Sequence, residues 1–95
     1  MKFLEKYDFN KEDIDEFINN TPKKLMDAIK EHKELVEKNL TYIKDLGVKT
    51  YREIFINYID MFLMDNSNFE GIFNKYVKDS LVEKLNDNYK MVEYL

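Results

Sequence analysis

The sequence predicts an all-α fold, a small helical-repeat (solenoid-like) bundle of about five to six helices. Three observations support this prediction. The chain of 95 residues contains only two Gly and one Pro, so few residues interrupt a helix. Signals for helix starts recur along the whole chain, whereas no segment shows the period of two that a strand requires. A stretch of eleven residues also occurs twice in related form.

Start and stop signals define six expected helices, at residues 2–7, 11–19, 22–46, 51–63, 68–77 and 81–94. Asn10 is expected to cap the second helix, and Thr21 to cap the third with Pro22 in its first turn. A Ser or Thr three residues before a Glu is typical of a capping box. Three such pairs are present: Thr50 with Glu53, Ser67 with Glu70, and Ser80 with Glu83.

The segment 22–46 carries one apolar stripe, with residues spaced by three and four. It is expected to form one helix, or two helices with a break near residues 28–34. Gly47 follows it and is expected to end the helix in a left-handed conformation. His32 is the only histidine and lies on the stripe, so it is expected to be a packed or half-buried structural residue.

The chain contains an internal repeat. Residues 17–27 read FINNTPKKLMD and residues 55–65 read FINYIDMFLMD, with six of the eleven positions identical. Segments 3–10, 42–49 and 81–88 align at a spacing of 39. The pattern predicts a single domain over residues 1–95, with about 2.5 copies of a 38–39-residue unit. The alternative is chance similarity between helices rich in Lys, Asn and Ile.

Composition argues against several classes of function. Without Cys, thiolate catalysis, disulfides and Cys-based metal sites are excluded. His32 has no evident nucleophile to activate, and the two Gly stand alone rather than in a phosphate-binding loop. We therefore expect a non-enzymatic protein with no catalytic residues, cofactor or metal. The absence of a long apolar run and of a signal-peptide pattern predicts a cytoplasmic protein without a membrane partner.

Binding to another protein is the function that the sequence favours. Residues 51–64 are apolar around nearly the whole helix, which predicts either burial among other helices or contact with a partner. Seven Tyr and seven Phe add surface of the kind that interfaces favour. The candidate partner-binding residues are Tyr58, Met61, Phe62, Tyr89 and Tyr94. We expect an adaptor, an inhibitor or a self-associating unit, and thus a protein partner or a homo-oligomer.

The segment YIKDLGVKTYREIFINYIDMFL (42–63) resembles the repeats of the mitochondrial transcription termination factor (mTERF) family. The matching residues are Leu46-Gly47-Val48 and Ile54 through Leu63, with a looser match at Tyr7-Asp8-Phe9, Ile14, Pro22 and Leu25. The resemblance implies short paired helices that stack into a curved solenoid. It also implies a basic concave groove that holds nucleic acid.

This chain departs from that family in charge and in its turns. Its formal net charge is −4, it has one Arg, and the second copy lacks the turn Pro. Nucleic-acid binding is therefore the second expectation, because phosphate affinity depends on neutralising cations. The lysines that would carry it are Lys23, Lys24, Lys30, Lys44 and Lys49. A third expectation is an acidic inhibitor that occupies the basic groove of a nucleic-acid enzyme.

Overall fold

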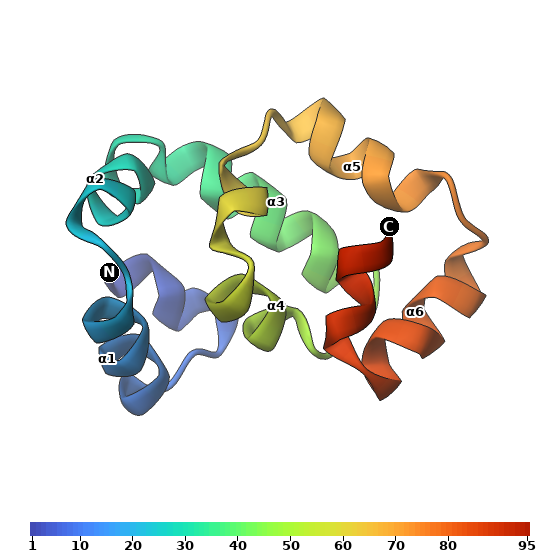
Figure 1. Cartoon of the computed structure of the whole chain (residues 1–95), viewed down its shortest axis with the longest axis horizontal. Coiled ribbons are helices and arrows are strands. Elements are labelled where there is room, and N and C mark those ends of the chain that lie inside the picture. The colour runs from blue at the N-terminus through green and yellow to red at the C-terminus, as the bar shows by residue number, and fades with distance from the viewer.

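A computed structural model describes all residues, 1–95, and the fold is entirely helical. The chain forms six α-helices and three short 3₁₀ helices and no strand, which confirms the predicted all-α class. The elements in chain order are η1 (Lys2–Tyr7), α1 (Lys11–Asn20), α2 (Lys23–Glu31), α3 (Lys33–Asp45), α4 (Tyr51–Asn57), η2 (Ile59–Leu63), α5 (Asn66–Asn74), α6 (Lys78–Asp87) and η3 (Tyr89–Tyr94). Figure 1 shows them along the long axis of the molecule.

Three of the expected helices are each divided in two. The segment 22–46 breaks at His32, inside the range given for the alternative, where φ is −107° and ψ is 34°. The helices expected at 51–63 and 81–94 break at Tyr58 and at Asn88, where the sequence has neither Gly nor Pro. The prediction of continuous helices there was wrong, because backbone contacts within the folded chain end these helices.

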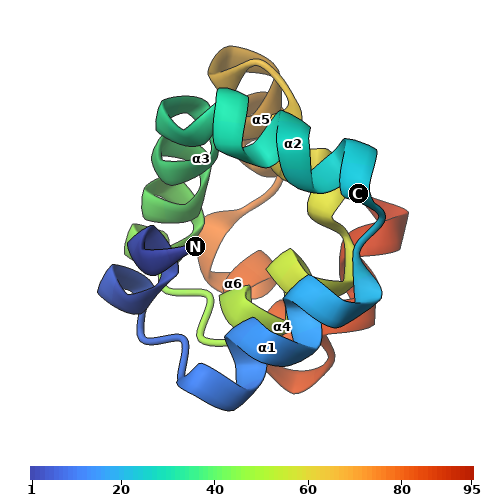
Figure 2. The ribbon, with the colours of Figure 1, turned by 90° about the vertical axis from the view of Figure 1, so that its left-hand side faces the viewer.

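Helix α3 occupies the middle of the fold. It contacts η1, α2, α4, η2 and α5. Figure 1 shows η1, α1 and α2 at one end of the long axis and α5, α6 and η3 at the other. The turned view in Figure 2 shows α1 beside α4, and their rings of Phe17 and Phe55 lie 5.1 Å apart. The Cα trace extends 35 Å along its longest axis.

The core is a chain of phenylalanine rings that runs through most of the molecule. All seven Phe side chains are buried. Phe55 lies at the centre, with the rings of Phe9, Phe17 and Phe62 at 5.1–5.4 Å between centroids. The chain continues from Phe62 to Phe69 and Phe73 of α5, and most pairs are tilted or edge-to-face, as aromatic pairs prefer. Helix α4 is therefore surrounded by other elements, which explains its apolar circumference.

One polar side chain lies inside this core. Asn39 of α3 is fully buried, and its amide nitrogen donates to the carbonyl oxygens of Phe62 and Met64, both at 3.0 Å. Its amide oxygen accepts from the side chain of Asn66 at 2.9 Å. These carbonyls lie where η2 ends and α5 begins, so no helical N–H serves them. Asn39 thus fixes the η2–α5 corner against α3.

The helix ends agree only in part with the sequence signals. Asn10 accepts from the backbone N–H of Asp13 at 2.7 Å, as a helix cap should, and Gly47 ends α3 with a φ of 103°. Thr21 does not cap α2, since its hydroxyl donates back to the carbonyl of Phe17 at 2.6 Å. Thr50 instead donates to the Leu85 carbonyl at 2.8 Å.

The two remaining capping boxes were also wrong. Ser67 and Ser80 lie inside the first turn of their helices, which begin earlier than expected. Asp65 takes the capping position before α5, where its carboxylate accepts from the backbone N–H of Ser67 at 3.2 Å. Val77 precedes α6 and has no side-chain group that can cap it.

Replacement of Asn39 tests the buried hydrogen bonds. Asn39→Ala leaves one buried and one partly buried carbonyl oxygen without a donor, and we expect a loss of about 3 kcal/mol in the free energy of unfolding. Denaturant titration followed by circular dichroism measures this loss. The control is Asn19→Ala on the exposed face of α1, which should change stability by less than about 0.5 kcal/mol. Equal stability of the two variants would contradict the assigned role of Asn39.

The two glycines provide a matched pair. A Cβ at Gly47 would meet only Val82 at an ordinary 3.6 Å, but the positive φ strains any other residue. Gly47→Ala should therefore destabilise by about 1–2 kcal/mol. Gly71 lies within α5 with nothing near its missing Cβ, so Gly71→Ala should stabilise by about 0.5–1 kcal/mol. Thermal unfolding of both variants checks the opposite signs, and a shift of the same sign in both would refute the argument.

Candidate functional site

A hollow lined mainly by hydrophobic residues lies between α6 and η3, and we call it the α6–η3 groove. It has a volume of about 350 Å³. Its lining residues are Tyr76, Val77, Ser80, Leu81, Lys84, Leu85, Met91, Tyr94 and Leu95. Lys84 is the only one of them with a charged side chain. The groove is thus an apolar channel with a single cation at its wall.

Exposed apolar side chains concentrate at this groove. The molecule has four large hydrophobic side chains with high exposure, and three of them line the groove: Tyr76 at 40%, Val77 at 73% and Tyr94 at 76%. The fourth is Ile18 on α1, at 41%. Clustering of this kind marks an interaction surface, whereas scattered apolar residues do not.

Polar contacts hold the two walls of the groove together. The Tyr76 hydroxyl and the Lys75 ammonium both donate to the carbonyl oxygen of Leu95 at 3.2 Å. These bonds join the end of η3 to the segment that links α5 and α6. Leu81 and Leu85 are buried and line the groove, and α6 packs against η3. The groove therefore has fixed walls before any partner binds.

The five predicted partner-binding residues differ in their exposure to solvent. Tyr94 lines the α6–η3 groove and is the most exposed of them. Tyr58 and Tyr89 are half-buried, with ring centroids 6.4 Å apart, and Met61 is half-buried against the core. Phe62 is fully buried between Phe55 and Phe69, so its selection was wrong: the fold uses this ring for packing.

Two residues of the groove, Tyr76 and Val77, were missed by the sequence analysis. The helix expected at 68–77 included both residues. In the structure α5 ends at Asn74, so they lie in the segment that links α5 to α6. A signal was present. Tyr76 and Val77 form an apolar pair between Lys75 and Lys78, in a polar stretch that has no core stripe to continue.

The lysines of the nucleic-acid alternative fall into two groups. Lys23, Lys24 and Lys30 lie on α2, which precedes α3. Lys44 lies in the last turn of α3 and Lys49 follows it, about 20 Å further along the axis of this 13-residue helix. All five are exposed, but no single hollow of the surface is lined by both groups.

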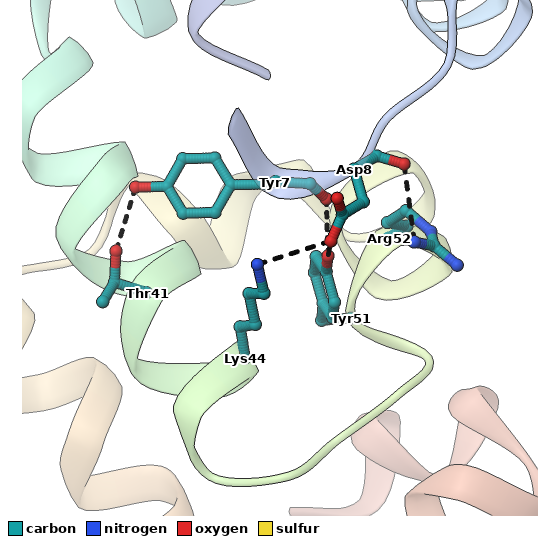
Figure 3. A network of polar contacts seen from close by, with 6 residues as sticks. All are labelled: Tyr7, Asp8, Thr41, Lys44, Tyr51 and Arg52. Carbon is teal, nitrogen blue, oxygen red and sulfur yellow. Dashed lines mark hydrogen bonds and ion pairs between the residues drawn. The ribbon is translucent and has the colours of Figure 1, made fainter. Parts of the chain in front are cut away.

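Lys44 of the second group belongs to a polar network around Asp8, drawn in Figure 3. Asp8 has a φ of 65°, and its carboxylate lies 3.4 Å from the Lys44 ammonium. The Tyr51 hydroxyl donates to the carbonyl of Tyr7 and lies 3.4 Å from the Asp8 carboxylate. Arg52 donates to the Asp8 carbonyl at 3.4 Å. The network joins the turn after η1 to α3 and α4, so Lys44 and Arg52 have a structural role.

Polar residues line most of the other hollows. One lies between α3 and α5, with a volume of about 620 Å³, and four of its lining residues are acids: Glu34, Glu37, Asp45 and Glu70. His32 lines another and is exposed at the α2–α3 break, which corrects the expectation of a packed or half-buried residue. No cluster of three or more His, Asp or Glu side chains is placed to hold a metal ion.

Comparison of the chain with protein-family models, curated proteins and solved structures found no match. None of the helices combines the length and the apolar character that a membrane span requires.

Three tyrosines have a pKa above the ordinary value of 10.0. Burial is the main cause for Tyr42, Tyr51 and Tyr58. Charged neighbours modify it: Glu70 raises the pKa of Tyr42, Lys44 acts against burial at Tyr51, and Glu93 raises the pKa of Tyr58. A hydrogen bond to Glu37, together with its negative charge, also raises the pKa of the exposed Lys6 above 10.5.

These shifts predict a loss of stability in alkali. A group whose pKa is raised by folding retains its proton longer in the folded chain, so it stabilises the fold at neutral pH and ceases to do so as pH rises through its folded value. We expect the free energy of unfolding to fall above about pH 10. Tyr42→Phe should make that fall less steep, while Tyr94→Phe on the exposed ring should not. Denaturant titrations between pH 8 and 11 measure both slopes, and stability that rises with pH would contradict the prediction.

Proposed function

We propose that this protein is a non-enzymatic binding module whose α6–η3 groove holds part of another protein chain. The observation that carries the proposal is the convergence of Tyr76, Val77 and Tyr94 on one apolar hollow. An amphipathic helix commonly binds in a groove of this kind, with anchors spaced three or four residues apart. Tyr and Met, which line it here, are enriched in interfaces.

We also propose that the internal repeat supports this site. The only two residues with positive φ, Asp8 and Gly47, are separated by 39 positions, one repeat length. Each ends a helix, is followed by a buried apolar residue (Phe9 or Val48) and then by the next helix. In the third copy, α6 ends at Asn88 without such a turn. On this proposal, the groove lies on the last and divergent unit of a helical repeat.

Site-specific photocrosslinking tests the binding function. A benzophenone amino acid replaces Tyr94 in the groove in one preparation and Lys24 on exposed α2 in the control, in cells that make the protein. We expect discrete crosslinked species from position 94 only. A second substitution, Val77→Glu, should reduce them about tenfold because it puts a charge in the apolar channel. Products that are the same at both positions, or that persist with Val77→Glu, would refute the proposal.

A further inference from the structure

We propose that one partner of the α6–η3 groove is helix α1 of a second copy of this chain, in a head-to-tail contact. This inference rests on the proposed function, because it uses the same groove. It starts from the distribution of exposed apolar side chains. Three of the four large ones line the groove, and the fourth, Ile18, lies on α1. A single contact between the two surfaces would cover all four.

Helix α1 has the form that the groove accepts. Ile14 and Ile18 are separated by four positions and so lie on one face of the helix, where Ile18 is exposed and Ile14 half-buried. Both line a shallow hollow of about 290 Å³ beside η1. The helix has ten residues, about 15 Å. Since α6 has the same length, α1 can lie along it without overhang.

The charges of the two surfaces are opposite. Helix α1 carries four acids (Glu12, Asp13, Asp15 and Glu16) against one Lys11. None of the four takes part in an ion pair within the chain. Lys84 is the one charged side chain in the lining of the groove, and it is also without an ion-pair partner. Asp15 lies three positions before Ile18, on the same face, so it is the acid that we place opposite Lys84.

One molecule cannot make this contact with itself. Figure 1 shows α1 at one end of the long axis and α6 with η3 at the other, and the Cα trace is 35 Å long. The contact therefore joins the head of one copy to the tail of the next. Such a heterologous contact leaves one free groove and one free α1 on every pair, so assembly continues unless the rotation closes a ring.

Two single variants test the geometry. Ile18→Asp puts a charge on the contact face of α1 and leaves the groove unchanged, whereas Val77→Glu puts a charge in the groove and leaves α1 unchanged. Both positions are exposed, so the fold should persist, as circular dichroism and thermal unfolding will check. In analytical ultracentrifugation, the mass of the wild type should rise above 11.6 kDa with concentration. Each variant alone should bind itself at least about tenfold more weakly.

The decisive measurement is the mixture of the two variants. Equimolar Ile18→Asp and Val77→Glu should form a dimer and stop there, since one intact α1 meets one intact groove. A control mixture of Val77→Glu with the double variant should stay monomeric. Charge reversal gives a second arm: Lys84→Glu should weaken association about fivefold, and Asp15→Lys in the same chain should restore it. Lys24→Glu on α2 should change nothing.

The outcomes separate this inference from the proposed function. A wild type that stays monomeric up to about 1 mM, while position 94 crosslinks another protein, overturns the self-contact and leaves the binding function standing. Association that the variant mixture fails to restore shows a groove-to-groove or other contact, and also overturns the inference. A monomeric wild type with no groove-dependent crosslink overturns both.

Discussion

The hydrogen bonds of Asn39 inside an apolar core are the constraint on which the rest of the arrangement depends. A chain that breaks its helices every few turns leaves many carbonyl groups without a helical donor. At the η2–α5 corner, the carbonyls of Phe62 and Met64 face α3, and each would be unsatisfied without the Asn39 amide. With Asn66 completing the set, no buried side-chain nitrogen or oxygen lacks a partner. The corner is therefore fixed, and it brings Phe62 against Phe69.

Local signals in the sequence predicted the parts of the fold that depend on a few neighbouring residues. Asn10 caps α1 because the bond from its side chain spans only three positions. Gly47 ends α3 because the turn needs a positive φ, which Gly adopts without strain. The helical class followed from the absence of period-two segments. Each of these predictions required no knowledge of what lies across the fold.

Local sequence signals gave wrong predictions where contacts with distant parts of the chain determine the structure. The Thr50 hydroxyl donates to the Leu85 carbonyl, 35 residues away, and so it does not form the local cap that the spacing with Glu53 suggested. Helix α4 ends at Asn57 with neither Gly nor Pro nearby, and η2 then packs against α3. The same limit applied to the site. Tyr94 could be predicted from the sequence because it is a terminal aromatic residue. Val77 could not, because its place in the groove depends on the end of α5 at Asn74.

The sorting of aromatic residues explains why a groove remains open. Phenylalanine has no polar atom and all seven are in the core, while most tyrosines lie at its edge. The ring-to-ring chain reaches α5 and ends at Phe73. Beyond it, α6 and η3 are held by aliphatic side chains, and the nearby aromatics, Tyr76 and Tyr94, point their surface outward. No element of residues 1–95 covers this aliphatic floor. Seven of the nine residues that line the groove are hydrophobic, so a partner bound there would be stabilised by the apolar area that it removes from water.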